Sequence, residues 1–290
     1  MTLPPGLPVV DHHCHLSPNG EGVGAARRFA AAGGTHLFLT TQNYAKAAPR
    51  TVDEYRAQFD ATESLARRIR EDVGLVVYPV VAPYPVDLVE IAPELGVAKA
   101  LEVHLGALDL AGKWVRERRA VALGEVGRPH FEVEPAVGTA VDTAFRHAFA
   151  VARESDCPLV VHSADLDVAG FAELAARAAE AGLRPERVVK HYARQRLAPP
   201  DRSSVTPSYL ARRDLFREVL HDRGPWFLET DFLDDPTRPG AVLDLATVPR
   251  RAASIAAGPS AESDLLWVPF VESVETVYGW RPELGAGGRR

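Results

Sequence analysis

The sequence is short of cysteine and of long apolar runs. It has two cysteines, Cys14 and Cys157, in 290 residues and no C-x-x-C pair, which excludes a disulfide scaffold and a zinc ribbon. No stretch of about 18 apolar residues occurs, so no membrane span is predicted. Residues 1–6 lack the basic and apolar segments of a secretory signal. These absences lead us to expect a cytoplasmic protein.

An excess of positive charge is also missing. The chain has 33 lysines and arginines against 39 acidic residues, a net charge of −6. Sequence-independent binding to nucleic acid needs many cations that neutralise phosphates, so a broad basic surface is disfavoured and only a local basic groove is left open. Hydrophobic residues make up 46% and charged residues 25%, which is the composition of a soluble globular protein.

Short apolar runs alternate with longer helical patterns along the chain. Seven runs bounded by Gly, Pro or Asp are predicted to be strands, and five stretches with three-to-four-residue apolar spacing are predicted to be helices. The strands are Val9–Leu16, Thr35–Thr41, Gly74–Val81, Val121–Gly127, Pro158–Ser163, Arg187–Tyr192 and Trp226–Asp231. The helices are Val23–Ala32, Thr51–Asp72, Ala136–Glu154, Val168–Ala181 and Tyr209–Asp222.

This alternation predicts parallel strands joined by right-handed crossovers, in either an α/β barrel or a doubly wound sheet. Ala98–Arg119 is predicted to be a helix, because its leucines share one helical face. A short strand at Ser203–Pro207 brings the expected total to eight, the number in a (β/α)8 TIM barrel of about 250 residues. With no repeat or low-complexity linker, we expect one domain over residues 1–290, with helices and a tail in residues 240–290.

The first predicted strand is too polar for a sheet interior unless its polar groups find partners. Because side chains alternate across a strand, Asp11, His13 and His15 are expected on one face, and His12 and Cys14 on the other. Two imidazoles on one face, about 7 Å apart at Cα, can bind one divalent cation. The alternative is a pair of buried, hydrogen-bonded histidines.

Four other predicted strands carry an ionisable group at or near the carboxyl end. These groups are Glu125, His162, His191 and Asp231. A barrel gathers its strand ends around one mouth, so we expect them to meet His13 and His15. Four imidazoles and two carboxylates suit zinc, manganese or a related ion, and six groups are too many for one tetrahedral centre. Two metal ions that share Glu125 would use them all.

The order of these motifs resembles that of the TatD-like metal-dependent hydrolases of the amidohydrolase superfamily. The motifs are Asp11-x-His13-x-His15, Gly124-Glu125-Val126-Gly127, His162-Ser163, His191 and Glu229-Thr230-Asp231, and they cover nearly the whole chain. The resemblance implies a TIM barrel and a binuclear metal site. The implied ligands are His13, His15, Glu125, His162, His191 and Asp231. The family includes nucleases that degrade DNA, often from the 3′ end.

Two motifs depart from the better-known nuclease-like members. After Gly-Glu-Val-Gly those members usually have Leu-Asp-Tyr, whereas this chain has Arg128-Pro129-His130. After the sixth-strand histidine they often have Cys-Phe-Ser-Gly, whereas this chain has Tyr192-Ala193-Arg194. The Arg-Pro-His variant looks more like a largely archaeal TatD-related branch. These positions are where substrate contacts would be, so the departures leave the metal site intact and the DNA substrate open.

The predicted reaction is the hydrolysis of a phosphoester on a nucleotide, a nucleic-acid end or another small molecule. Two divalent ions (zinc, manganese, magnesium, cobalt or nickel) about 3.5–4 Å apart would share a water and lower its pKa toward 7. Asp231 would accept the proton that this water loses and later donate it to the leaving group, and Glu125 would bridge the ions. No membrane partner is expected, and the sequence predicts no oligomeric state.

Residues around the expected mouth have supporting roles in this hypothesis. Asp11 and Glu229 would orient ligand imidazoles as hydrogen-bond acceptors; the alternative is a buried carboxylate paired with arginine. Four residues that follow ligand-bearing strands would bind an anionic substrate, unless they are solvated surface groups. They are Arg128, His130, Arg194 and Arg196.

Three other functions compete with this hypothesis. The same site would also suit an amide, lactone or amine substrate, although no lysine is placed to bridge metals as a carbamate and Glu125 fills that place. A metal-binding scaffold without turnover is the second. The third is a dinucleotide site at Gly20-x-Gly22-x-x-Ala25, which is disfavoured because the first strand is polar and no acidic residue ends the second strand to bind a ribose.

Overall fold

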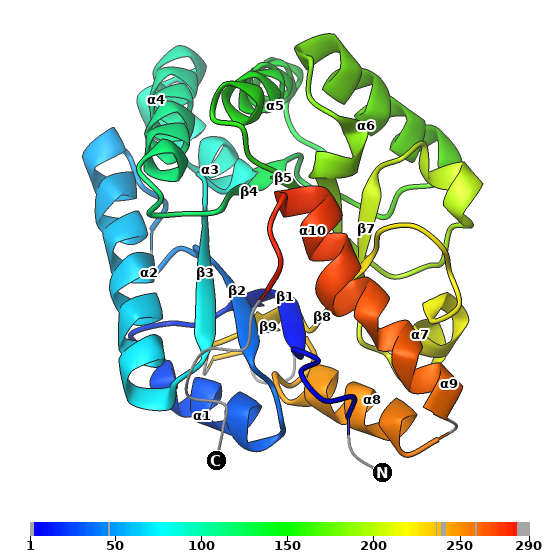
Figure 1. Ribbon diagram of the computed structural model, residues 1–290. Helices are drawn as coiled ribbons and strands as arrows, with labels where there is room; N and C mark the ends of the chain where they lie inside the picture. Colours follow the sequence, from blue (N-terminus) through cyan, green and yellow to red (C-terminus); the bar gives the residue numbers. More distant parts are fainter. Residues whose placement is uncertain (1–2, 46, 236, 239–241, 259, 283–290) are drawn as a thin grey trace.

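A computed structural model describes residues 3–45, 47–235, 237–238, 242–258 and 260–282. Within these residues, parallel strands form one curled sheet with helices around it (Figure 1). The strands are β1 (Val10–His15), β2 (His36–Thr40), β3 (Val76–Val81), β4 (Ala122–Gly127), β5 (Leu159–His162), β6 (Val188–Ala193), β7 (Thr206–Leu210), β8 (Phe227–Glu229) and β9 (Phe232–Leu233). The longer helices are α1 (Val23–Ala31), α2 (Val52–Val73), α3 (Pro85–Leu95), α4 (Val97–Arg116), α5 (Pro135–Glu154), α6 (Val168–Ala181), α7 (Arg213–Val219), α8 (Thr247–Ala256) and α10 (Ser273–Tyr278).

The sheet confirms an α/β, TIM-barrel-like fold. Its order is β8-β7-β6-β5-β4-β3-β2-β1-β9, so neighbours follow the sequence without the reversal of a doubly wound sheet. The described residues contain nine strands instead of the expected eight, because Thr230 and Asp231 separate β8 from β9. Asp231 has φ 49°, a left-handed conformation that interrupts a strand. The parallel sheet is therefore a curled half-barrel whose two end strands are consecutive in the sequence.

Two predicted elements needed correction. The helix expected over Tyr209–Asp222 begins later, because residues up to Leu210 belong to β7 and α7 starts at Arg213. The strand expected at Ser203–Pro207 also begins later, at Thr206, and ends at Leu210. Pro207 lies inside this strand and pairs with Lys190 of β6. The sequence analysis also missed α3, which starts on a proline directly after β3.

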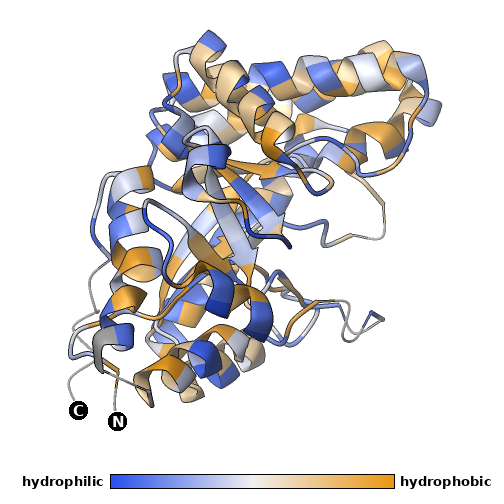
Figure 2. Cartoon of the chain, turned by 90° about the vertical axis from the view of Figure 1, so that its right-hand side faces the viewer, coloured by the Kyte–Doolittle hydropathy of each residue, from blue (hydrophilic) through white to orange (hydrophobic). Residues whose placement is uncertain are grey.

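Apolar side chains fill both sides of the sheet. Leu37, Leu39 and Cys14 pack in a cluster with buried residues of α1 and of the second half of α2. Another cluster, called the inner cluster here, contains residues of all eight strands from β1 to β8. They include Val10, Phe38, Val80, Ala122, Val160, Val189, Tyr209 and Phe227. The surrounding helices carry both hydrophobic and hydrophilic residues (Figure 2), as expected when one face packs on the sheet and the other meets water.

The inner cluster includes the first residues of several strands and residues of α10. Val10, Ala122 and Phe227 are the first residues of their strands, and Val274, Val277 and Tyr278 belong to the same cluster. Helices α8 and α10 lie within residues 240–290, and residues 283–290 at the end of that region lie outside the described residues. This packing leaves the carboxyl end of the sheet for polar groups.

The expectation that His12 shares a face with Cys14 is wrong. The register of β1 against β2 shifts between Asp11 and Cys14, so strict alternation does not hold there. The His12 ring stacks on Phe227 of the inner cluster, 3.7 Å between centroids, while Cys14 packs on the helix side.

In the described part of the chain, no helix has both the length and the apolar character needed to cross a membrane.

Candidate metal centre

Six side chains that sequence analysis selected meet at the carboxyl end of the sheet. They are His13 and His15 of β1, Glu125 of β4, His162 of β5, His191 of β6, and Asp231 between β8 and β9. We call this set the polar cluster. Its members divide into overlapping groups whose ligand atoms lie within 4.8 Å of one another. The predicted convergence of residues from distant parts of the chain is therefore present.

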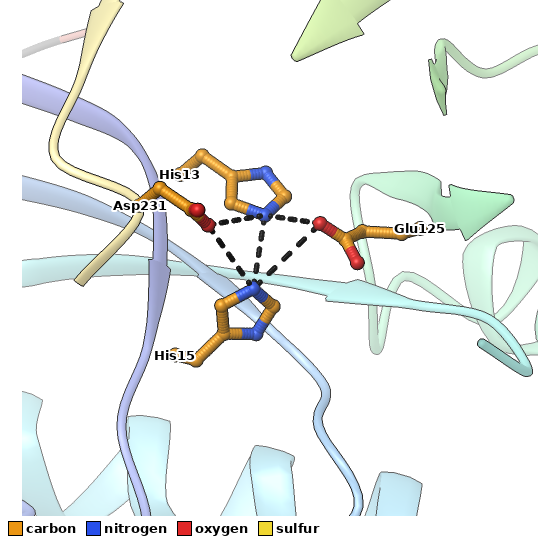
Figure 3. A group of neighbouring side chains, drawn as sticks. All are labelled: His13, His15, Glu125 and Asp231. Atoms are coloured by element: carbon orange, nitrogen blue, oxygen red, sulfur yellow. Dashed lines mark hydrogen bonds and ion pairs between the residues drawn. The ribbon is translucent and has the colours of Figure 1, made fainter. Parts of the chain in front are cut away.

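The first group has the spacing of a tetrahedral metal site (Figure 3). His13 Nε2 lies 3.1 Å from His15 Nε2 and 2.9 Å from Glu125 Oε1. Asp231 Oδ1 lies 3.8 Å from His13 Nε2 and 3.6 Å from His15 Nε2. Ligand atoms about 2.1 Å from one ion at tetrahedral angles would be about 3.4 Å apart. Two imidazole nitrogens and two carboxylate oxygens thus fit a divalent cation in both type and spacing.

The second group contains Glu125, His162 and His191. Glu125 Oε1 lies 2.8 Å from His191 Nε2, and Oε2 lies 3.6 Å from His162 Nδ1. The two imidazole nitrogens are 3.2 Å apart. Glu125 is therefore common to both groups, and its Oε1 contacts histidines of each. A third overlapping group consists of His13, His191 and Glu229.

Opposite charges face each other in the polar cluster and shift the pKa values of several of its members against burial. Burial alone would raise the pKa of Glu125, but His191, His162 and the other imidazoles outweigh burial and hold this pKa well below its usual range. Burial would lower the pKa of His15, yet hydrogen bonds to Asp231 and Glu125 raise it to about 10. The pKa of His191 rises to about 9 against burial, mainly through Glu125. The carboxylates are thus held in the ionised form that binds metal.

The imidazoles have oxygen partners on the side away from the polar cluster. Thr40, at the end of β2, faces two of them: its carbonyl oxygen lies 3.2 Å from His15 Nδ1 and its Oγ1 lies 3.5 Å from His13 Nδ1. Such partners fix the ring orientation and the tautomer of a metal-binding histidine. The sequence analysis missed Thr40, although its place at the carboxyl end of a strand was a usable signal.

Residues 10–279 match the family described as TatD related DNase. The chain belongs to the TatD family. MJ1127, an uncharacterized protein of Methanocaldococcus jannaschii, is 28% identical over 282 residues, covering 96% of this chain and 98% of the relative. YjjV, a TatD homolog from Escherichia coli, has a similar fold with a TM-score of 0.62 at 19% identity, covering 93% and 98%. A TatD-like protein from Archaeoglobus fulgidus has a TM-score of 0.59 at 13% identity, covering 89% and 100%.

Membership of the TatD family confirms the predicted enzyme class, a metal-dependent hydrolase. It also confirms the resemblance that the motifs indicated. The two solved structures support the fold, since both cover most of this chain.

In this TatD-family chain, Glu229 and Asp11 have different contacts. Glu229 is fully buried, with Oε1 3.5 Å from His191 Nδ1 and accepting a 2.7 Å hydrogen bond from the backbone N–H of Tyr192. Asp11 instead accepts hydrogen bonds from the Thr230 hydroxyl at 2.6 Å and the Thr230 backbone N–H at 3.1 Å. Its carboxylate therefore contacts the junction between β8 and β9 in place of an imidazole ring.

The four residues expected to bind substrate are engaged differently. Arg128 pairs with Asp142 of α5 at 2.9 Å and Glu173 of α6 at 2.8 Å. Arg196 pairs with Asp222 at 2.7 Å. These two guanidinium groups are thus held by carboxylates of their own chain.

The other two substrate candidates lie closer to the polar cluster. His130 lies beside His162, and Arg194 lies beside Tyr192, which follows His191 in the sequence. The His130 ring centroid is 5.7 Å from that of His162. Arg194 is half-exposed, pairs with Asp165 at 2.7 Å and lies over the Tyr192 ring, next in sequence to His191.

The glycine-rich loop that resembled a dinucleotide fingerprint surrounds a carboxylate of the chain itself. Asp234 accepts hydrogen bonds from the backbone N–H groups of Ser17 at 3.0 Å, Glu21 at 2.8 Å and Gly22 at 2.7 Å. A side chain at Gly20 would collide with Asp234, and Gly22 has φ 50°. The glycines therefore permit the close approach of the loop to Asp234, which occupies the place a phosphate would take.

Proposed function

We propose that this TatD-family hydrolase uses two divalent metal ions to hydrolyse a phosphoester, with nucleic-acid ends among its substrates. The main support is Glu125, which contacts histidines of both groups: its Oε1 lies 2.9 Å from His13 Nε2 and 2.8 Å from His191 Nε2, and its Oε2 lies 3.6 Å from His162 Nδ1. One ion would be held by His13, His15, Glu125 and Asp231, and the other by Glu125, His162 and His191. Bound divalent ions supply an acidified water and polarise a phosphoryl oxygen.

Asp231 moves the proton in this proposal. It extends from the junction of β8 and β9, and its side chain is 16% exposed at the edge of the polar cluster. Its pKa is held below the usual range, because His15 and His191 outweigh burial. The ionised carboxylate accepts a proton from the attacking water and returns it to the leaving group.

Two neighbouring carboxylates, Glu229 and Asp11, position His191 and Asp231 in this proposal. The Glu229 carboxylate lies 3.5 Å from His191 Nδ1 and would orient that ring so that Nε2 points toward Glu125. Asp11 fixes Thr230 and thereby the left-handed turn that presents Asp231. We assign substrate contact to His130 and Arg194, because the His130 ring lies beside that of His162 and Arg194 lies over the ring of Tyr192, next in sequence to His191.

The proposed architecture is one domain built as a (β/α)8 barrel. Strand β8 pairs with β7, and β9 pairs with β1, so the two segments act as one strand interrupted at Asp231. This arrangement would bring every ligand-bearing strand end to one rim, in line with the site geometry.

A substrate screen tests the proposed function. We expect the manganese- or zinc-loaded protein to hydrolyse bis-p-nitrophenyl phosphate or single-stranded DNA, and the chelator-treated protein to lose this activity. Metal analysis is expected to find two ions per chain. Turnover of lactones or amides without any phosphoester turnover would favour the carbonyl alternative. Metal binding without hydrolysis of any substrate would favour the scaffold.

A further inference from the structure

We propose that Tyr84 is a positioning residue that sets the tautomer of His162 and, through it, the affinity of the ion held by Glu125, His162 and His191. This inference rests on the proposed function. Tyr84 follows β3 and was not among the residues selected from the sequence. Its hydroxyl lies 3.2 Å from His162 Nε2.

The two ring nitrogens of His162 face different surroundings. Nδ1 points into the polar cluster, 3.2 Å from His191 Nε2 and 3.6 Å from Glu125 Oε2. Nε2 meets Tyr84 on the opposite side. A neutral imidazole binds a metal only through the nitrogen that lacks a proton. Metal binding at Nδ1 therefore requires the proton on Nε2, where the Tyr84 oxygen accepts it.

Tyr84 differs from the outer partners of two other imidazoles. His15 Nδ1 faces the Thr40 carbonyl oxygen and His191 Nδ1 faces the Glu229 carboxylate, and both partners only accept hydrogen bonds when Glu229 is ionised. A hydroxyl can donate as well as accept. Tyr84 thus favours the metal-binding tautomer of His162 by accepting its Nε2 proton, but less exclusively than Thr40 and Glu229 favour that tautomer in His15 and His191. The ion at His162 is accordingly expected to be the more weakly held of the two.

The chain around Tyr84 holds its ring in place. Pro83 and Pro85 flank it and restrict the backbone on both sides. Its carbonyl oxygen accepts a 3.0 Å hydrogen bond from the backbone N–H of Asp87 in the first turn of α3. The Tyr84 and His162 rings meet edge to face, with centroids 5.0 Å apart. A rigid backbone and a packed ring suit a residue that orients a neighbour.

Removing the hydroxyl tests the proposal through metal affinity. In Tyr84→Phe we expect the weaker of the two metal affinities to fall about 10–100-fold, the usual cost of losing such an outer partner, while the stronger is unchanged. Competition titration with a chelator and cobalt or manganese measures both. Tyr44→Phe is the matched control, because its hydroxyl contacts Thr62 and no member of the polar cluster. Equal loss at both sites, or none, would overturn the proposal.

A second measurement does not depend on metal or activity. Nitrogen-15 spectra of labelled histidines report which ring nitrogen carries the proton. In the metal-free protein we expect Tyr84→Phe to shift the tautomer populations of His162 and leave those of His15 unchanged, with Tyr44→Phe matching the wild type. An unchanged His162 would overturn the proposal. A wild type that binds one ion or none would overturn the two-metal function instead, and the spectra would still decide the role of Tyr84.

Discussion

His12 and His15 of β1 lie in two regions that shift the pKa of a histidine in opposite directions. His12 belongs to the amino-terminal half, where it stacks on Phe227, and burial is the main reason why its pKa is lowered well below the usual value. His15, three residues later, lies in the polar cluster, where carboxylates raise its pKa to about 10. Burial opposes charge in both places. Only the polar cluster supplies opposite charges to offset it.

The comparison shows that burial alone does not decide whether an ionisable group stays charged. His104 is a second example on the neutral side: it is 4% exposed on α4, and its Nδ1 has no hydrogen-bond partner among the described residues. Groups of that kind contribute packing, whereas a cation that binds in the polar cluster replaces the protons of its imidazoles and pairs with its ionised carboxylates. Four changes test this division, in order of decreasing effect.

Removing the shared carboxylate should have the largest effect. Glu125→Ala, and likewise His13→Ala, is expected to lower metal-dependent turnover on the order of 10³-fold or more and to reduce the bound metal, while the fold is kept. Hydrolysis of bis-p-nitrophenyl phosphate, metal analysis and circular dichroism measure these effects. His147→Ala is the control, because His147 pairs with Asp109 away from the polar cluster. Wild-type metal content and activity in Glu125→Ala would refute the assignment.

A change in the inner cluster should lower the stability of the protein and leave its metal binding intact. Phe227→Ala removes a fully buried ring and is expected to lower the free energy of unfolding by about 3–5 kcal/mol, with metal stoichiometry retained below the transition. Urea unfolding gives the free energy. Phe131→Ala is the control, because that ring is 49% exposed and should change stability by about 0.5 kcal/mol or less. Similar losses for both variants would contradict the inner packing.

Acid should lower the free energy of unfolding through His104, a buried histidine without a charged partner among the described residues. Burial lowers the pKa of His104 to about 3 from 6.5, so the unfolded chain binds this proton first as the pH falls. The contribution of His104 to stability is complete above pH 6.5 and is lost toward pH 3, at about 1.4 kcal/mol per pH unit. His104→Phe should therefore lose about 2 kcal/mol less than the wild type between pH 6.5 and 5. Parallel stability curves would show that His104 does not titrate as inferred.

The smallest effect is expected from an arginine engaged in ion pairs. Arg128→Gln should lower the free energy of unfolding by about 1 kcal/mol or less, since the guanidinium and its partners are partly exposed. Its kcat/KM should stay within about twofold of the wild type, whereas Arg194→Gln should raise KM about tenfold if a charge-assisted hydrogen bond to substrate is lost. Equal KM values for the two variants would remove Arg194 from the substrate site.

The sequence was most informative where a residue type conflicts with its position. Histidines and acids at the ends of apolar strands have no reason to be there without a partner, so the whole polar cluster could be selected from the chain alone. Element boundaries were less certain. Strand β7 extends through Leu210, because Tyr209 and Leu210 pair with Leu228 and Glu229 of β8, and helical spacing within residues 209–222 does not reveal that pairing.

Some features of this protein follow from the sequence, and others follow only from the tertiary structure. The ligand chemistry, the alternation of strands and helices, and membership of a family were determined by the sequence, because each depends on residue type and order. The interruption of the last strand at Asp231, the capture of Arg128 by α5 and α6, and the pairing of Tyr84 with His162 were decided by the tertiary structure alone. Hydrogen bonds reach only a few ångströms, and which atoms come that close is fixed only when distant segments pack.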